Sequence, residues 1–124
     1  QPLKISSEVY LIKCVAGLDD YLFKALAAKP AHGIVVEAFG CGNVPPAVKN
    51  GIELVRKQGI PVVLTTRVHT GRVVPAYSYV GSALSMKDAD IILAGEITGQ
   101  KARIKLLLAL GLTDDIEKIR TYFD

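Results

Sequence analysis

Residues 35–46 restrict the possible folds of this chain more than any other segment. A short apolar run ends in the turn Gly40, Cys41, Gly42 and Asn43, and a proline then opens an amphipathic stretch. This order predicts a strand, a tight loop and a helix. In an open parallel sheet, ligands bind where the carboxyl ends of strands meet the amino ends of helices. We therefore expect Asn43, whose side chain both donates and accepts hydrogen bonds, to lie at the edge of any site.

The rest of the chain repeats this alternation of apolar runs and amphipathic segments. The first run, residues 9–15, is almost continuously apolar, which is typical of a strand buried on both faces. Val48, Ile52 and Val55 have the spacing of a buried helical stripe. Strands are expected at 9–15, 33–38, 60–66 and 91–93, and helices at 19–29, 47–58, 80–87, 98–110 and from 114 onward.

Strands that alternate with helices form right-handed crossovers and a parallel sheet. The sequence therefore predicts a single α/β domain over residues 1–124. We expect a three-layer fold with a small parallel sheet and flavodoxin-like winding.

Capping residues predict where several helices begin and end. Asp19 is expected to cap the first helix, and Asp114 with Glu117 forms a capping box before the last. Gly59 and Gly111 follow periodic apolar segments, where a residue that tolerates positive φ often ends a helix. Each of these signals is local, so it predicts a boundary independently of the fold.

Composition excludes several classes of function. The net charge is +3, and acidic and basic residues are interspersed, so the chain lacks the basic stripe of a nucleic-acid-binding protein. Few of its aromatic residues lie near basic ones, which disfavours a platform for stacking bases. No run reaches the roughly eighteen uncharged apolar residues of a membrane span. Half of the residues are hydrophobic, which requires either a very complete core or apolar surface that a partner covers.

Cysteine and histidine residues indicate a compartment and exclude a metal. Cys14 lies in an expected buried strand and Cys41 in the loop, and two free thiols suit a reducing compartment. We therefore expect a cytoplasmic protein. His32 and His69 have no partner at ligand spacing, so neither a metal nor a cofactor is predicted.

The loop at 40–43 is not a complete dinucleotide-binding fingerprint. That pattern needs a third glycine where this chain has Pro45, and no acidic residue ends the following strand. Two interpretations remain: a tight turn, or a loop that presents Asn43 to a ligand or a second chain. Thr65 and Thr66 could act as nucleophiles only beside a base, and threonine is ordinarily a strand former.

Two charged residues near the ends of the expected strands need partners. Glu37 is the one carboxylate inside an expected buried strand, so it lies either at an interface between chains or against a base such as Arg67. Arg67 could hold a carboxylate in a fork, but pairing with an acidic residue of the chain is favoured. Three further cations are expected on the solvated side of the fourth helix: Lys101, Arg103 and Lys105.

Four motifs occur in a specific order and spacing. They are Gly-Ile-Val-Val at 33–36, Gly-Cys-Gly-Asn-Val-Pro at 40–45, Val-Val-Leu-Thr-Thr-Arg at 62–67 followed by Thr-Gly, and Gln-Lys-Ala-Arg-Ile-Lys-Leu at 100–106 followed by Leu-Ala-Leu. In this order they resemble the C-terminal domain of the bacterial-type L-asparaginases, which are amidohydrolases that use threonine nucleophiles. The resemblance extends from about residue 9 to about residue 123.

The resemblance implies a division of labour between two domains. The N-terminal domain of the family, which is absent from this chain, carries the nucleophile and its base, so no catalytic residue is expected here. The C-terminal domain contributes to a homodimer or homotetramer, in which its loop completes the neighbouring active site. The substrate would be L-asparagine, and L-glutamine is the alternative. The implied substrate-binding residues are Asn43 with Gly40, Cys41 and Gly42, supported by Glu37 and Arg67.

One departure from the family leaves the substrate open. Some members place a carboxylate on the substrate amino group from the segment after Thr-Gly, but residues 70–79 contain no acidic residue here. The choice between asparagine and glutamine is therefore undecided. Two alternatives to an asparaginase also remain, namely a subunit of the archaeal tRNA-dependent amidotransferase and a stand-alone effector-binding or assembly module.

Overall fold

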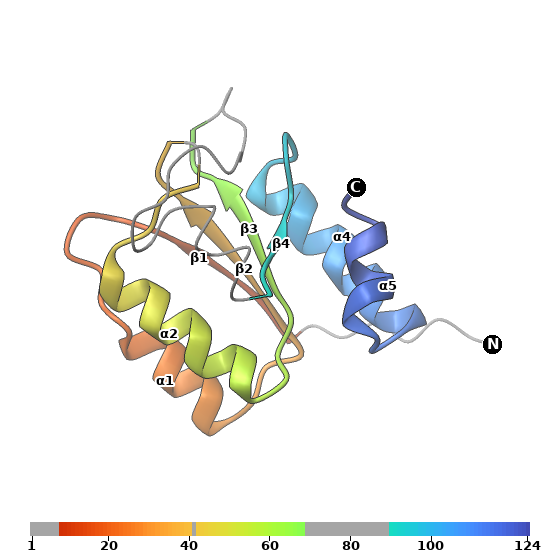
Figure 1. Ribbon diagram of the computed structural model, residues 1–124, viewed down its shortest axis with the longest axis horizontal. Helices are drawn as coiled ribbons and strands as arrows, with labels where there is room; N and C mark the ends of the chain where they lie inside the picture. Colours follow the sequence, from red (N-terminus) through yellow and green to blue (C-terminus); the bar gives the residue numbers. More distant parts are fainter. Residues whose placement is uncertain (1–7, 41, 69–89) are drawn as a thin grey trace.

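The computed structural model describes residues 8–40, 42–68 and 90–124 of the chain. In this part of the chain, four parallel strands form one sheet (Figure 1). They are β1 (Val9–Lys13), β2 (Gly33–Ala38), β3 (Val62–Thr66) and β4 (Ile92–Leu93). The helix expected at 80–87, together with Cys41 and His69, lies outside the described residues.

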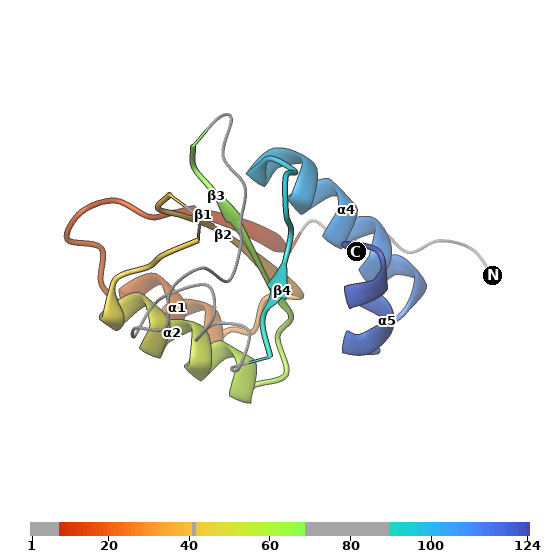
Figure 2. The same cartoon turned by 45° about the horizontal axis from the view of Figure 1, so that its top comes forward.

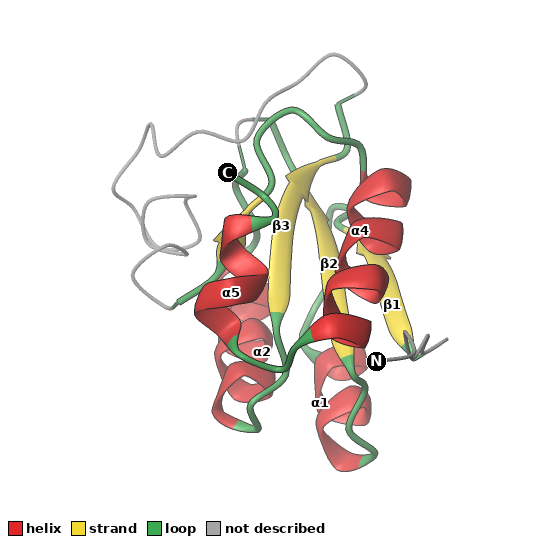
Figure 3. Cartoon of the chain, turned by 90° about the vertical axis from the view of Figure 1, so that its right-hand side faces the viewer, coloured by secondary structure: helices red, strands yellow, loops and turns green. Residues whose placement is uncertain are grey.

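Helices cover both faces of the sheet (Figure 1, Figure 2). Helices α1 (Tyr21–Ala28) and α2 (Pro46–Lys57) lie on one face. Helices α4 (Gly99–Leu112) and α5 (Ile116–Thr121) lie on the other, side by side (Figure 3). The predicted three-layer α/β domain with a small parallel sheet is confirmed. None of the described helices is long and apolar enough to cross a membrane.

The strand order is sequential, β1-β2-β3-β4. The flavodoxin order 2-1-3-4-5 places the first strand inside the sheet, so the winding differs from the expected one. The reason is that the crossovers through α1 and α2 both move the chain one strand further in the same direction. Right-handed crossovers in one direction put both helices on the same face. The second helical layer comes from α4 and α5, which follow the last strand.

Strand β2 is the centre of the domain, because all six of its residues are buried. Its side chains alternate between two hydrophobic cores. Ile34 and Val36 belong to the core beneath α1 and α2, whereas Val35 belongs to the core beneath α4 and α5. The sheet therefore separates two cores, each closed by one pair of helices.

The prediction that the first strand is buried on both faces is wrong. Among the described strands β1 pairs only with β2, and the exposed fraction of Tyr10 is 46%. The strand also ends at Lys13 rather than at Val15. An apolar run shows that a strand packs against something, but it does not show whether the strand lies at the centre or at the edge of the sheet.

The boundaries of α2 confirm the local signals. Val48, Ile52 and Val55 are fully buried, as their spacing predicts. Gly59 follows the end of the helix with φ +81°, a conformation that favours glycine.

Three other helix ends differ from the expected ones. Asp20 rather than Asp19 is the N-cap of α1, although the Asp19 side chain accepts a backbone hydrogen bond in the first turn. α4 continues through Gly111, because the packing of the helix on the sheet outweighs the low helix propensity of one glycine. The side chain of Asp115, not of Asp114, caps α5.

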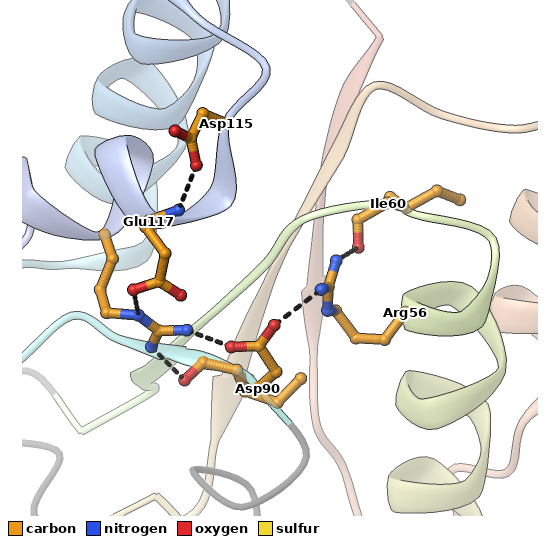
Figure 4. Close-up of polar contacts among 7 residues, drawn as sticks. Arg56, Ile60, Asp90, Asp115 and Glu117 are labelled. Atoms are coloured by element: carbon orange, nitrogen blue, oxygen red, sulfur yellow. Dashed lines mark hydrogen bonds and ion pairs between the residues drawn. The ribbon is translucent and has the colours of Figure 1, made fainter.

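A charged cluster joins the two helical layers near the beginning of β4 (Figure 4). Asp90 accepts from Arg56 of α2 at 3.0 Å and also from Arg120 of α5. Each arginine also donates a hydrogen bond to a backbone carbonyl just before a strand. Arg56 donates to Ile60 at 3.1 Å, and Arg120 donates to Ile91 at 3.2 Å. Asp90 therefore connects the two layers across the edge of the sheet, and its φ is +63°.

Gly51→Ala is expected to destabilise the domain because α1 and α2 approach each other at this residue. An added Cβ would lie 2.8 Å from the Phe23 side chain. Overpacking costs about 1–3 kcal/mol, and the better helix propensity of alanine returns about 1 kcal/mol. Denaturant unfolding should show a net loss of up to about 2 kcal/mol. The control is Asn50→Ala at the exposed neighbouring position, which should be neutral or slightly stabilising; equal stabilisation by both variants would contradict this packing argument.

Candidate functional site

The candidate site lies at the carboxyl edge of the sheet, around the loop that follows β2. The backbone of Phe39 pairs with that of Asn43, with N···O distances of 2.7 Å and 2.9 Å. Between them, Gly40 has φ +47° and Gly42 has φ +117°. Both angles lie in the region that favours glycine, which explains the Gly-x-Gly pattern. The tight turn expected from the sequence is therefore present.

Asn43 is fixed by its backbone rather than by its side chain. It is half-buried, and within the described part of the chain no hydrogen bond to its side-chain amide is found. The N-cap of α2 is Pro45, without a side-chain capping bond, so Asn43 does not cap that helix. The backbone of Asn43 thus places its side-chain amide at the edge of the sheet, where the amide has no hydrogen-bond partner among the described residues.

Glu37 lies at the end of β2 and is buried, with 7% of its surface exposed. Its carboxylate forms an ion pair with Lys13 of β1 at 3.9 Å. It also packs against Gly99, the first residue of α4, where an added Cβ would lie 2.7 Å from it. A carboxylate at the amino end of a helix is stabilised by the helix dipole. The base that pairs with Glu37 in the described structure is therefore Lys13 and not Arg67.

Arg67 follows β3 and takes another role. Its guanidinium lies 4.7 Å from the centre of the Phe39 ring, and Nη1 donates to the carbonyl of Cys14 at 3.3 Å. Its backbone N donates to Ala38 at 2.9 Å. The favoured pairing of Arg67 with an acidic residue is not found among residues 8–40, 42–68 and 90–124. Arg67 instead covers the aromatic residue at the base of the Asn43 loop.

The hydroxyl groups of both strand threonines are engaged. Thr65 is fully buried and donates to the carbonyl of Ile97 at 2.5 Å. The oxygen of Thr66 accepts from the backbone N of Val68 at 3.1 Å. Both residues thus fix the chain where it leaves β3, as strand-forming residues.

Cys14 is fully buried just beyond β1. Burial raises the pKa of its thiol to about 11, while the nearby charge of Arg67 lowers the pKa and that of Glu37 raises it. Because the thiolate is the reactive form, this cysteine is a poor nucleophile at neutral pH.

The charged residues of α4 do not all face solvent. Lys101 is exposed as expected, but Nε of Arg103 donates to the carbonyl of Val9 at 2.7 Å and so holds β1 against the helix. Lys105 lies 5.3 Å from the centre of the Phe123 ring. Within the described residues, no three His, Cys, Asp or Glu side chains are grouped so that they could hold a metal ion.

Sequence reasoning missed Lys13 and Gly99 as neighbours of the site. Lys13 is the one charged residue in the first apolar run, and the parallel register places it beside Glu37. If β1 and β2 are taken as neighbouring strands, a lysine at this position predicts an ion pair with Glu37. Gly99 had no comparable signal, because its contact with Glu37 arises only when α4 packs on the sheet.

Comparison with known proteins shows matches along nearly the whole chain. Residues 8–123 match the family described as the glutaminase/asparaginase C-terminal domain. A probable L-asparaginase from Deinococcus radiodurans is 34% identical over 123 residues, which are 99% of this chain and 37% of that protein. An L-asparaginase from Bacillus licheniformis is 34% identical over 102 residues, 82% of this chain and 32% of that protein.

A second type of relative also matches. A glutamyl-tRNA(Gln) amidotransferase subunit from Aeropyrum pernix is 37% identical over 116 residues, which are 93% of this chain and 26% of that protein. The chain thus spans only between 26% and 37% of the length of these three curated relatives.

The burial of Cys14 predicts slow alkylation in the folded protein. In a Cys41→Ser variant Cys14 is the remaining thiol. A pKa of about 11 in place of 9.0 lowers the thiolate fraction at pH 8 about a hundredfold. Iodoacetamide should therefore react at least about a hundredfold more slowly with the folded chain than with the urea-unfolded chain.

The same raised pKa has a consequence for stability. Because the folded chain favours the protonated thiol, the raised pKa contributes to the free energy of unfolding. This contribution is fully present below pH 9.0 and is lost as the pH rises through about 11.

In the alkylation experiment, equal rates for the folded and unfolded chains would contradict the burial of Cys14.

Proposed function

The chain belongs to the glutaminase/asparaginase C-terminal domain family, and on that premise we propose that it is part of an amidohydrolase that converts L-asparagine and water to L-aspartate and ammonia. Relatives named L-asparaginase or probable L-asparaginase support this proposal. Because the chain spans about a third of their length, the activity is proposed for a longer protein that contains this domain.

In this proposal the domain completes the active site and does not supply its nucleophile. Covalent amide hydrolysis requires a nucleophile beside a general base. Within the described residues, the hydroxyls of Thr65 and Thr66 are engaged in hydrogen bonds, and burial keeps the thiol of Cys14 protonated. We therefore assign the nucleophile and its base to the rest of the longer protein.

The observation that carries the proposal is the state of Asn43. Its backbone is held by two hydrogen bonds to Phe39, whereas its side-chain amide has no partner in the described part of the chain. An amide carried on a backbone held in this way offers two donors and an acceptor to the carboxylate, amino or amide groups of asparagine. We propose that this amide, with the loop of Gly40, Cys41 and Gly42, meets the substrate across the interface of a homo-oligomer.

Glu37 and Arg67 have supporting roles in this proposal. Glu37 joins β1, β2 and the start of α4 through Lys13 and Gly99. Arg67 covers Phe39, which pairs with Asn43. Both residues keep the loop at the carboxyl edge of the sheet, and neither is placed on the substrate.

A second candidate is a domain of an amidotransferase that acts with glutamyl-tRNA(Gln). The observation that favours it is the 37% identity to the amidotransferase subunit from Aeropyrum pernix over 93% of this chain. Ammonia release from free L-asparagine by the longer protein, without tRNA, distinguishes the asparaginase from this candidate.

The isolated 124-residue chain is expected to be inactive. It lacks an activated nucleophile in its described part, and nucleophilic activation together with orientation supplies much of the barrier reduction in such reactions. The measurement is ammonia release from L-asparagine by the purified chain, compared with the longer protein. Turnover by the isolated chain at the level of an ordinary enzyme, roughly 1–1,000 per second, would contradict the proposal that the nucleophile and its base lie in the rest of the longer protein.

Asn43→Ala in the longer protein is expected to lower kcat/KM for L-asparagine roughly three- to a hundredfold. The loss of a hydrogen bond costs about 0.5–1.5 kcal/mol, or about 1.5–3 kcal/mol when the partner is charged, and each 1.36 kcal/mol is about tenfold in rate. The melting temperature should change little, because the side chain makes no hydrogen bond within the described domain.

The matched control is Asn50→Ala, the same substitution at an exposed position of α2. It should leave kcat/KM unchanged and the stability unchanged or slightly higher. If Asn43→Ala instead costs about 1 kcal/mol of stability with unchanged kcat/KM, Asn43 has a purely local role and does not belong to the site.

A further inference from the structure

Strand β1 is the longer of the two edge strands of the described sheet, with five residues against two in β4. Its backbone groups alternate in direction. The backbone N of Cys14 donates to Glu37, and the carbonyl of Glu8 accepts from His32, so the even-numbered residues bond toward β2. The odd-numbered residues therefore point their backbone N–H and C=O groups away from the sheet. These residues are Val9, Leu11 and Lys13.

An edge of this kind is a template for a further strand. Its outward N–H and C=O groups form a row that another chain can pair with, and a longer edge offers a longer row. Four of the five residues of β1 are Val, Tyr, Leu and Ile, which favour strands. Such an edge leads to aggregation unless a charge, a bulge or a covering element closes it.

Arg103 of α4 lies at the outer edge of β1. The helix covers the β1 side of the sheet (Figure 3). Nε of Arg103 donates to the outward carbonyl of Val9 at 2.7 Å. A strand added beside β1 would lie about 4.8 Å away and would bring its own N–H to about 2.9 Å from an outward carbonyl. The guanidinium therefore occupies the position of the first backbone donor of an added strand.

We propose that Arg103 closes the outer edge of β1 against strand addition by a second copy of this chain. The excluded strand is β1 of the second copy, because two such edges are self-complementary in antiparallel order. A register that pairs Val9 with the partner's Lys13 brings Arg103 toward that lysine, and like charges on facing strands repel. The inference concerns β1 and α4 and does not rest on the proposed function.

Hydrogen exchange of backbone amides in the longer protein tests whether the edge is open. The N–H of Ile12 points toward β2 and should exchange slowly. The N–H of Leu11 points outward and should exchange at least about a hundredfold faster. Equally slow exchange of the two amides would show that another segment of the polypeptide covers the edge, and would overturn the proposal.

Arg103→Met in the longer protein tests the closure itself. The substitution keeps the aliphatic stem and removes the donor and the charge. Species larger than the unsubstituted protein's own assembly should form at least about tenfold faster. The measurement is light scattering, at a temperature at which circular dichroism shows that the variant is folded. In the assembled material the amide of Leu11 should become protected. The matched control is Lys101→Met, which removes a cation from an exposed position of the same helix.

A second substitution separates closure of the edge from a general loss of stability. Tyr10 lies on β1 and is 46% exposed. Tyr10→Lys adds a charge to the edge strand without restoring the bond to Val9. In the Arg103→Met background it should return the assembly rate to that of the unsubstituted protein. Its control is Leu22→Lys on α1, at a leucine that is 44% exposed, which adds the same charge away from the edge and should not slow assembly.

Two further results would overturn the proposal. The first is a folded Arg103→Met variant that assembles no faster than Lys101→Met. The second is assembly that Leu22→Lys slows as much as Tyr10→Lys does, since this would make net charge rather than the edge the cause. If Arg103→Met does not fold, Arg103→Gln takes its place in the same comparisons, because it also removes the charge but keeps an N–H donor.

Discussion

The burial of β2 is the constraint on which the rest of this structure depends. The strand has a neighbour on each side and a helical layer on each face, so all six of its residues are removed from water. Its alternating side chains supply both cores, and its carboxyl end leads directly into the Gly40–Asn43 turn. A fully buried strand therefore leads into the loop to which we assign substrate contact.

The burial of β2 also determines the electrostatics of the edge. A carboxylate at the end of a buried strand is unfavourable unless a charge or dipole compensates it. Glu37 has Lys13 on one side and the amino end of α4 on the other, and the close approach requires glycine at position 99. The same carboxylate contributes to the raised pKa of Cys14, whose main cause is burial. Glu37 thus pairs with Lys13 of β1, packs against the first residue of α4 and contributes to the raised pKa of Cys14.

Much of the fold could be predicted from local patterns. The stripe of Val48, Ile52 and Val55, the positive φ of Gly59 and the turn between Phe39 and Asn43 depend on side-chain spacing or on glycine's freedom, both of which are visible in the sequence. The candidate site was less predictable. Asn43 was found from its position after an apolar run, but its supporting contacts were not, because Lys13 and Gly99 are distant from Glu37 along the chain.

The sequence by itself determined which segments become strands and helices, since periodicity, capping groups and turn residues act within a few residues of one another. It also determined membership of an amidohydrolase-type domain family, through motifs in a specific order. Only the tertiary structure decided the sequential strand order, the edge position of β1, the pairing of Glu37 with Lys13 and the exposure of one face of α4. These features depend on which segments pack together over long separations, and hydrophobic burial is non-directional, so an apolar pattern alone does not specify the partner that covers it.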